Sequence, residues 1–343
     1  MNKVAIHHTE GSFSDCWVEF CKKNQIPFKL VDCYRSDIIS QVRDCSIVMW
    51  HYHHADCKDV LFAKQLMLSL ETAGKKVFPD FHTGWHFDDK VGQKYLLESV
   101  DAPLVSSYVF FEKDKALEWV KRTDFPKVFK LRRGAGASHV RLIKNRRSAK
   151  KLINQAFGKG FSQYDPGANL KDRLRKYKIG KNSLLDLLKG VARFGYTTDF
   201  DRVTGKERGY VYFQDFVPGN DYDIRIIVIG KRAFGIKRLV RSNDFRASGS
   251  GIIEYQKEHI SEVTVGVAFE VAEKLKSQCL ALDFIYSNGV PKIVEVSYGY
   301  TKGVYQNCPG YWDRELNWHE EPFNPEYWMV QGLLSDKGAE QEV

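Results

Sequence analysis

Residues 280–297 read LALDFIYSNGVPKIVEVS, two apolar stretches on either side of an Asn-Gly pair. Asn288 and Gly289 favour the tight turn of a β-hairpin, because both residue types tolerate positive φ angles. Each predicted strand carries one carboxylate among apolar neighbours, Asp283 and Glu295. A buried carboxylate is costly unless it has a cationic partner. The hairpin therefore predicts either two adjacent oxygen ligands for Mg²⁺ or two carboxylates satisfied by lysine or arginine.

The sequence before this hairpin has strand patterns in close succession. Residues 210–217, 223–230 and 233–240 are apolar stretches separated by turn residues, and 260–278 has the periodicity of an amphipathic helix. The charged residues of this region include Asp223, Arg225, Lys237, Arg238, Arg241 and Arg246. Arginines that converge on a cleft can hold an anionic substrate and stabilise a phosphoryl transition state. Arginines on a solvated face are the plainer interpretation.

A second predicted hairpin, FPKVFKLRRGAGASHVRLIK at 125–144, has a glycine-rich tip. Lys130 lies in its first apolar strand, shortly before Gly134 and Gly136. Glycine lets backbone N–H groups wrap around a phosphate group, and a lysine adds positive charge beside it. The pattern predicts a phosphate site or, on the plainer interpretation, an ordinary flexible turn.

The first 87 residues alternate predicted strands with predicted helices. The strands cover 4–8, 28–33 and 46–53, and the helices cover 14–23 and 58–74. This alternation implies a small parallel sheet. The chain as a whole is therefore expected to be α/β, with α+β parts after residue 87.

Basic residues are concentrated in one segment. The chain has a formal charge of +9, yet residues 141–190 alone hold 14 Lys and Arg against three acids. Helices are predicted at 146–157 and 182–194, so 146–208 is interpreted as a basic helical insertion. The insertion would dock an anionic partner, or it is a solvated face. Clustered Lys and Arg also fit a nucleic-acid-binding protein, although few aromatic residues for base stacking lie among them.

The cysteines and the N-terminus indicate a cytoplasmic protein, and the histidines give only a weak indication of a metal site. The seven cysteines form no CxxC pair and are odd in number, so reduced thiols are expected. His51, His53 and His54 lie near Cys57, but no second spaced pair of metal ligands accompanies them. The first residues lack the apolar run of a secretion signal, and no stretch approaches the roughly 20 apolar residues of a membrane span.

Taken in chain order, the charged residues resemble the motif set of the ATP-grasp superfamily. The sequence is most similar to the branch that contains ribosomal-protein glutamate ligase and glutathione synthetase. The resemblance covers roughly residues 88–300 without the insertion. It rests on Lys90, Lys130 with its glycine loop, Gln214-Asp215-Phe216, Asp223-Ile224-Arg225, the DFRAS segment 244–248, Asp283 and Glu295.

The resemblance implies an ATP-grasp fold, in which a small parallel-sheet N-terminal domain precedes two α+β lobes that clasp ATP. The N-terminal domain would span 1–87. Lobe 1 would span 88–209, with the basic insertion at about 146–208, and lobe 2 would span 210–300. The aromatic-rich segment 301–343 would pack on the core.

The resemblance also implies a role for each matching residue. Lys90 and Lys130 would contact the phosphates of ATP, under a flap at 134–138 that includes Gly134, Gly136 and Ser138. The rest of the nucleotide would be bound by Gln214, Asp215, Phe216 and Asp223. The catalytic arginines would be Arg225, Arg238 and Arg246, and the ligands of Mg²⁺ or Mn²⁺ would be Asp283, Glu295 and Ser297. Ser297 departs from the family, which usually has asparagine at that position.

The implied activity is ATP-dependent ligation of a carboxylate to an amine through an acyl-phosphate. The substrates would be small molecules, with a sugar or peptide acceptor, in surface-polysaccharide or peptide modification. The protein would position them and neutralise charge. A kinase that phosphorylates a hydroxyl is one alternative, and nucleic-acid binding through 141–190 is another. Tyr300, Tyr305 and Trp312, with Lys302 and Arg314, are predicted either to line an acceptor pocket or to pack as core.

Overall fold

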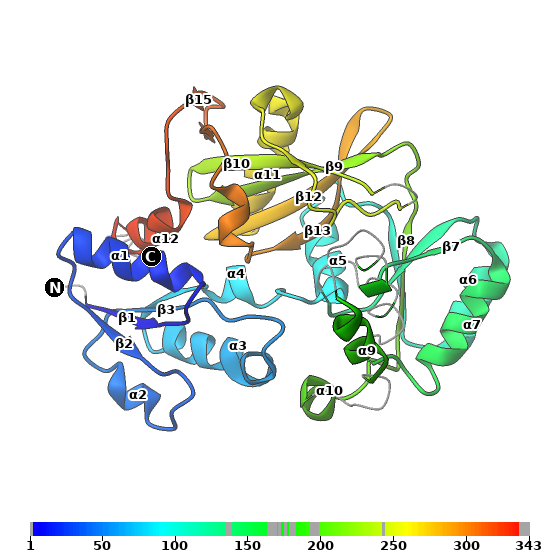
Figure 1. Cartoon of the computed structure of the whole chain (residues 1–343), viewed down its shortest axis with the longest axis horizontal. Helices are drawn as coiled ribbons and strands as arrows, with labels where there is room; N and C mark the ends of the chain where they lie inside the picture. The colour runs from blue at the N-terminus through cyan, green and yellow to red at the C-terminus, as the bar shows by residue number, and fades with distance from the viewer. Residues whose placement is uncertain are drawn as a thin grey trace.

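The N-terminal domain is built on four parallel strands in the order β2-β1-β3-β4 (Figure 1). The computed structural model describes residues 3–134, 139–162, 170, 173–174, 177, 183–192, 199–241 and 244–335. All residues of β1 and β3 are buried, as expected for a parallel sheet covered on both faces. The small parallel sheet predicted from the sequence is therefore confirmed. Its elements are β1 (Val4–His7), α1 (Phe13–Lys23), β2 (Phe28–Val31), α2 (Ile38–Gln41), β3 (Ile47–Trp50), α3 (Cys57–Thr72), β4 (Lys76–Phe78) and α4 (Phe81–Gly84).

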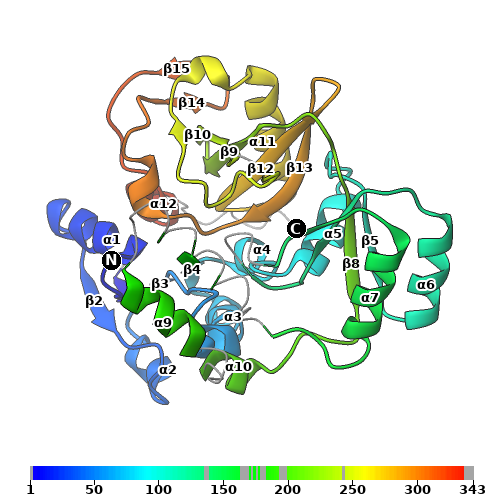
Figure 2. The same cartoon turned by 45° about the vertical axis from the view of Figure 1, so that its right-hand side comes forward.

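Lobe 1 contains a four-stranded antiparallel sheet in the order β5-β8-β6-β7, next to α6 and α7 (Figure 2). Its core includes Val120, Phe129, Ile153 and Phe213. The predicted hairpin at 125–144 is present as the antiparallel pair β6 and β7. The elements are β5 (Ser107–Phe110), α6 (Lys113–Arg122), β6 (Lys127–Lys130), β7 (Arg141–Ile143), α7 (Arg146–Ala156) and β8 (Val211–Asp215).

Two boundaries of lobe 1 differ from the sequence-based division. The division at residue 210 assigned β8 to lobe 2, but β8 pairs with β5 and β6. The helix α7 was assigned to the insertion, but its apolar face is part of the lobe 1 core. The many Lys and Arg residues of α7 led to its assignment to the insertion, but these side chains lie on the solvent side of the helix, opposite the apolar face. Two helices of the basic segment, α9 (Leu184–Ala192) and α10 (Asp199–Thr204), follow, and α10 packs against α3.

Lobe 2 is a seven-stranded sheet with the order β13-β12-β9-β10-β14-β15, and β11 pairs with β10. The predicted hairpin between β12 and β13 is confirmed, with φ angles of 51° at Asn288 and 78° at Gly289. One face of the sheet packs against α11 and α5. The elements are α5 (Lys90–Ser99), β9 (Tyr222–Ile229), β10 (Arg232–Leu239), β11 (Ile253–Glu254), η2 (Lys257–His259), α11 (Glu262–Lys274), β12 (Cys279–Ser287) and β13 (Val290–Ser297).

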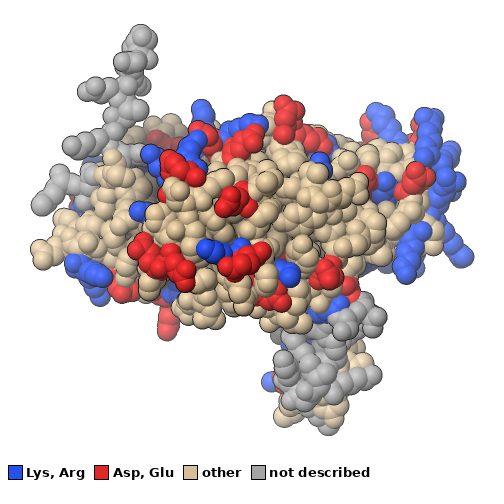
Figure 3. Space-filling view, turned by 90° about the horizontal axis from the view of Figure 1, so that it is seen from above, with Lys and Arg blue, Asp and Glu red and all other residues tan. Residues whose placement is uncertain are grey.

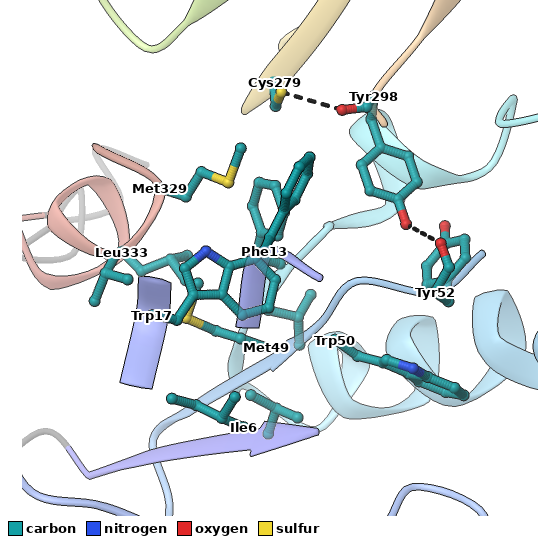
Figure 4. Close-up of a cluster of buried hydrophobic side chains, with 14 of the residues drawn as sticks. Ile6, Phe13, Trp17, Met49, Trp50, Tyr52, Cys279, Tyr298, Met329 and Leu333 are labelled. Carbon is teal, nitrogen blue, oxygen red and sulfur yellow. Dashed lines mark hydrogen bonds between the residues drawn. The ribbon is translucent and has the colours of Figure 1, made fainter. Parts of the chain in front are cut away.

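The other face of the seven-stranded sheet shares one core with the N-terminal domain. The C-terminal segment completes this core through η3 (Lys302–Tyr305), β14 (Tyr311–Asp313), β15 (Trp318–His319) and α12 (Pro325–Ser335). Trp17 of α1 lies close to Met329 and Leu333 of α12 (Figure 4). The Tyr298 hydroxyl donates a hydrogen bond of 2.6 Å to the carbonyl of Tyr52. We call the N-terminal domain, the seven-stranded sheet and the C-terminal segment together the fused body.

The surface and the thiols complete the description of the fold. Lys and Arg gather at the end of the molecule where α6 and α7 lie (Figure 3).

All seven cysteines are free, and five of them are buried. Burial raises the pKa of Cys33 and Cys308 to about 12. In the described part of the chain no helix is both long and apolar enough to cross a bilayer.

Candidate active site

A cavity of about 780 Å³ lies where the N-terminal domain, lobe 1 and lobe 2 meet. This volume is in the upper part of the range of ligand sites. Gly136 and Ser138 lie outside the described residues. Every other residue that the resemblance implied for ATP, the metal ion or catalysis lines the cavity: Lys90, Lys130, Gly134, Gln214, Asp215, Phe216, Asp223, Arg225, Arg238, Arg246, Asp283, Glu295 and Ser297.

Two arginines and two aspartates form a buried ion network on the sheet of lobe 2. Arg225 lies opposite Asp283 across β9 and β12, and its Nε and Nη2 atoms donate to the two carboxylate oxygens at 2.5 and 2.8 Å. Arg238 binds Asp223 in the same two-pronged way, at 2.6 and 2.7 Å. Its Nη2 atom also lies 2.9 Å from Asp283. Bidentate pairing of this kind fixes the plane of each guanidinium group.

Asp283 and Glu295 lie opposite each other across β12 and β13, as the hairpin predicted. Burial alone would raise the pKa of Asp283, but Arg225 and Arg238 outweigh it and hold the pKa below the usual range. Glu295 lies 3.0 Å from the Nζ atom of Lys90. Both carboxylates therefore have the cationic partners that the plainer interpretation expected.

The predicted metal ligands can be tested for their fit to Mg²⁺. Two carboxylates and the Ser297 hydroxyl on one hairpin are the hard oxygen donors that this ion prefers. Glu295 is one-third exposed at the cavity wall. The Ser297 hydroxyl donates to the carbonyl of Gly299 at 2.9 Å and accepts from the Gly299 N–H at 3.1 Å, so one lone pair of its oxygen remains available. Both oxygens of Asp283 already accept from arginine, so Glu295 fits a cation best.

Two lysines lie beside this hairpin. Lys130, at the end of β6, is buried and donates a 3.1 Å hydrogen bond to the carbonyl of Val294. Burial lowers its pKa to about 8. Burial alone would also lower the pKa of Lys90, but the carboxylates of Glu295 and Asp88 raise it above its ordinary value. The cavity therefore holds two ammonium groups close to the Glu295 carboxylate.

The start of the glycine-rich tip is tied to the beginning of α5. The Lys90 ammonium donates to the carbonyl of Gly134 at 2.7 Å, and the Gly134 N–H donates to Asp88 at 2.8 Å. Asp88 has a φ angle of 55°, and burial raises its pKa to about 6. Sequence reasoning missed Asp88. The signal was the pair of adjacent acids before Lys90, of which Asp89 alone serves as the cap of α5.

Three of the residues predicted to bind the rest of the nucleotide lie at the end of β8. The Gln214 side chain is buried and donates to the Ser107 hydroxyl at 3.1 Å. Asp215 accepts from Lys127 at 2.6 Å. Phe216 meets Phe245 edge to face at 5.9 Å. The side chains of Gln214 and Asp215 are thus bonded within lobe 1, and the Asp215 N–H donates to the carbonyl of Ser106 at 2.9 Å. The Phe216 ring lines the cavity.

Arg246 links the loop after β10 to the second strand of the glycine-rich hairpin. Its guanidinium group pairs with Asp244 at 2.8 Å and reaches the carbonyl of Val140 at 3.4 Å. Of the aromatic and charged residues predicted for an acceptor pocket, Tyr300, Lys302 and Tyr305 line the cavity. Trp312 instead packs on Trp318, and Arg314 pairs with Glu273 away from the cavity.

The N-terminal domain forms the remaining end of the cavity. This end includes His51, His53 and His54, whose sequence pattern lacked the second ligand pair of a metal site. Among the described residues, no three His, Cys, Asp or Glu side chains are grouped so that they could hold a metal ion. The residues that line this end are Thr9, Glu10, Gly11, Ser12, Phe13, Tyr34, His51, His53, His54, Asp56 and Asp59.

Comparison with known proteins finds no match by sequence but many by structure. No family model matches the sequence, and no curated protein matches it. A RimK domain ATP-grasp protein from Sphaerobacter thermophilus, however, shares 14% identity at a TM-score of 0.55, with 96% of this chain and 98% of that chain covered. The chain has the ATP-grasp fold. This confirms the fold that the motif order implied.

Other ATP-grasp structures align over most of this chain. The biotin carboxylase domain of Hydrogenobacter thermophilus 2-oxoglutarate carboxylase, crystallised with MgADP, gives a TM-score of 0.59 at 11% identity, covering 98% of this chain and 70% of that one. D-alanine–D-alanine ligase from Bacillus anthracis, in complex with ATP, gives 0.52 at 13% identity, covering 90% and 89%. At these identities the likeness concerns the fold, and the chemistry has to be argued from the site.

Proposed function

We propose that the chain is an ATP-dependent ligase that joins a carboxylate to an amine through an acyl-phosphate. The observation that carries the proposal is the convergence of Lys90, Lys130, Glu295 and the arginine network on one cavity that continues into the N-terminal domain. A phosphoryl-transfer site needs positive charge at one end and room for a second substrate at the other. The names of similar ATP-grasp structures include ligases and synthetases, which supports this class of reaction.

The reaction has two steps. An oxygen of the substrate carboxylate attacks the γ-phosphorus of ATP, and the bond from that phosphorus to the ADP oxygen breaks. The amine nitrogen then forms a bond to the acyl carbon while the bond from that carbon to the phosphate oxygen breaks, and the nitrogen loses a proton. Neither step needs a nucleophile from the protein, so its residues bind, orient and neutralise charge.

The charged residues fit these tasks in different ways. Lys90 and Lys130 offset the negative charge of the phosphate groups, and their burial strengthens that interaction. Arg225 and Arg238 are held rigidly by Asp283 and Asp223, so their positive charge is fixed before any substrate binds. Arg246, from the loop after β10, would meet the transferred group or the substrate carboxylate.

A divalent cation would be held mainly by Glu295, with Asp283 and Ser297 beside it. Mg²⁺ or Mn²⁺ in this position would neutralise charge on the nucleotide phosphates. The nucleotide itself would be bound by the end of β8, with Gln214, Asp215 and Phe216 at the adenine and Asp223 toward the ribose. We place the enzyme in the cytoplasm, acting on a sugar or peptide acceptor.

A screen for phosphate release tests the proposal. Purified protein is incubated with ATP, Mg²⁺, one carboxylate (L-glutamate, D-glucuronate or D-galacturonate) and one amine, or with hydroxylamine in place of the amine. Hydroxylamine traps an acyl-phosphate as a hydroxamate, which is identified by its mass. We expect formation of a hydroxamate that depends on ATP and on the carboxylate. The Glu295→Gln variant should be inactive and serves as the control. A phosphorylated product without an amide would support the kinase alternative instead.

A further inference from the structure

The loops after β1 and β3 meet at the N-terminal end of the cavity. The chain passes from β1 to β2 on one side of β1, and β3 lies on the other side. Such a topological switch point leaves a crevice at the carboxyl ends of the two strands, where open α/β sheets bind ligands. Ser12 and Phe13 follow β1 and His51 follows β3, and all three line the cavity at this place.

The ring of His51 is held in a fixed plane. It stacks on the ring of Phe13 with a centroid distance of 3.7 Å and an interplanar angle of 4°. The ring of Tyr298 meets it edge to face at 6.0 Å. Phe13 and Tyr298 are themselves fully buried, so neither support can move without disturbing the core.

The hydrogen bonds of His51 define which nitrogen carries the proton. The backbone N–H of Phe13 points at Nδ1 from 3.4 Å, and the Ser12 hydroxyl lies 3.0 Å from the same atom. A backbone N–H can only donate, so Nδ1 has to accept and the ring proton lies on Nε2. Burial lowers the pKa of His51 to about 3, which keeps the ring neutral.

The Nε2–H group of His51 faces the cavity. A Cβ atom on Gly299 would lie 3.6 Å from Nε2, so the absence of a side chain there keeps the approach open. Within the described part of the chain no acceptor is hydrogen-bonded to Nε2, and this atom is not among the fully buried polar atoms without a partner. The His51 side chain lines the cavity. His51 therefore offers one oriented N–H donor to a ligand.

The charges around this donor select the kind of acceptor atom. Glu10, Asp56 and Asp59 line the same end of the cavity. The nearby ammonium of Lys302 is already paired with Asp15 at 2.9 Å. A free carboxylate placed here would be repelled, whereas a hydroxyl or carbonyl oxygen would not, and a molecule bearing an ammonium group would be favoured.

We propose that this crevice binds the amine substrate and that the His51 Nε2–H group donates to a neutral hydroxyl or carbonyl oxygen of it. The assignment rests on the ligase function proposed above. It makes His51 a specificity-determining residue. The substrate class is an amine that carries hydroxyl or amide groups near the nitrogen, such as an amino sugar or an amino-acid amide, rather than an amino acid with a free carboxylate.

The first test compares named amines with the wild-type enzyme. D-Glucosamine and L-alaninamide are measured against L-alanine, each with the carboxylate that gives the largest hydroxamate signal. We expect a KM for at least one of the first two that is about tenfold or more below that for L-alanine. Equal or reversed KM values would overturn the proposed substrate class.

The second test removes the donor. His51→Phe keeps the stacking on Phe13 but has no N–H, and we expect it to raise the KM of the preferred amine about tenfold. The rate of hydroxamate formation with hydroxylamine, which is too small to reach the crevice and the acyl group at once, should stay within about twofold. His51→Gln, which retains an N–H donor, should recover most of the affinity. His82→Phe, an exposed histidine outside the cavity, is the matched control.

The outcomes separate this inference from the proposed function. An unchanged amine KM in His51→Phe, or an equal loss of hydroxamate formation, would overturn the role of His51. A histidine ¹⁵N spectrum in which His51 titrates between about pH 5 and 8, or carries its proton on Nδ1, would overturn the donor assignment. No hydroxamate from the wild-type enzyme with any carboxylate would overturn the ligase function and this substrate assignment with it.

Discussion

Lobe 1 and the fused body hold their parts of the cavity in different ways. In the fused body, Arg225, Arg238, Asp223 and Asp283 are locked in one ion network on a sheet that is covered by core on both faces. Lobe 1 has a core of its own and meets the rest through contacts such as the Lys130 hydrogen bond to Val294. In the enzyme that we propose, the fused body would supply fixed charge, and lobe 1, with its separate core, would supply the nucleotide-binding side.

The largest expected effect is a loss of activity on substitution of Glu295 or Asp283, and the two variants should differ in stability. Glu295→Gln removes a partly exposed carboxylate, so kcat/KM should fall about a thousandfold while the free energy of unfolding changes by about 1 kcal/mol. Asp283→Asn should lose activity and also unfold more easily, because it removes the negative charge between the buried Arg238 and the partly buried Arg225. Steady-state kinetics and urea unfolding of both variants measure the two quantities. Equal stability of the two variants would contradict the comparison.

Breaking the network from the arginine side should reduce stability most. Arg238→Met leaves Asp223 without its partner, and we expect the free energy of unfolding to fall by about 3–5 kcal/mol. The double variant Asp223→Leu/Arg238→Met should recover part of that loss, because it removes both charges at once. A double-mutant cycle in urea measures the coupling. Additive losses would show that the network is not a unit.

Lys130 tests the lobe 1 side. Lys130→Met should weaken ATP binding about 10- to 100-fold, the effect of one charge-assisted hydrogen bond, without a comparable loss of stability. In the wild type the Lys130 cation is lost as the pH rises through about 8, so ATP affinity should fall above that pH. Between about 8 and the ordinary pKa of 10.5 the unfolded chain binds more protons, so stability contributed by this group rises with pH. Calorimetric titration from pH 7 to 10 measures the affinity, and an equally steep pH dependence in the variant would exclude Lys130 as its source.

The two regions should also differ in amide hydrogen exchange. We expect the strands β6 and β8 of lobe 1 to exchange faster than β9 and β12 of the fused body, because a smaller separate core opens more easily. Addition of ADP and Mg²⁺ should protect lobe 1 more than the fused body. Mass spectrometry of exchanged peptides measures both. Uniform protection across the two sheets would contradict the prediction that lobe 1 opens more easily than the fused body.

The smallest expected effect lies in the C-terminal segment. The Tyr300 hydroxyl donates to Glu326 at 3.0 Å, and both side chains are buried. Tyr300→Phe should lower the free energy of unfolding by about 1–2 kcal/mol. Tyr300 also lines the cavity, so the KM of the amine substrate decides whether its ring has a second role. A raised KM at unchanged stability would assign Tyr300 to the acceptor pocket rather than to the core.

Individual strands and turns could be predicted from the sequence, whereas the order of the strands within each sheet could not. The turn at Asn288-Gly289 fixes the hairpin, and the hairpin alone brings Asp283 opposite Glu295, so their adjacency could be predicted. The pairing of Asp283 with Arg225 could not be predicted, because it requires β12 to lie beside β9, and strand order in an antiparallel sheet is not encoded locally. The same reason explains why β8 was assigned to the wrong lobe.

The N-terminal end of the cavity was the least predictable part of the candidate site. The sequence drew attention to His51 because other histidines surround it. Its significance depends on Phe13, which is 38 residues away in the chain and supplies both the stacking ring and the N–H donor. Such a contact follows from the parallel pairing of β1 and β3, and no periodicity in the sequence records it.

The shared core of the fused body also affects how the chain can be made. Trp17 near the start and Met329 near the end belong to one core, and the Lys76 ammonium donates to the carbonyl of Leu333 at 3.0 Å. During synthesis the first domain leaves the ribosome long before the helix that completes it. Its sheet stays partly uncovered until α12 has been made, which favours slow folding. A stop codon before α12 should therefore yield insoluble protein, although it leaves every residue of the first domain in place.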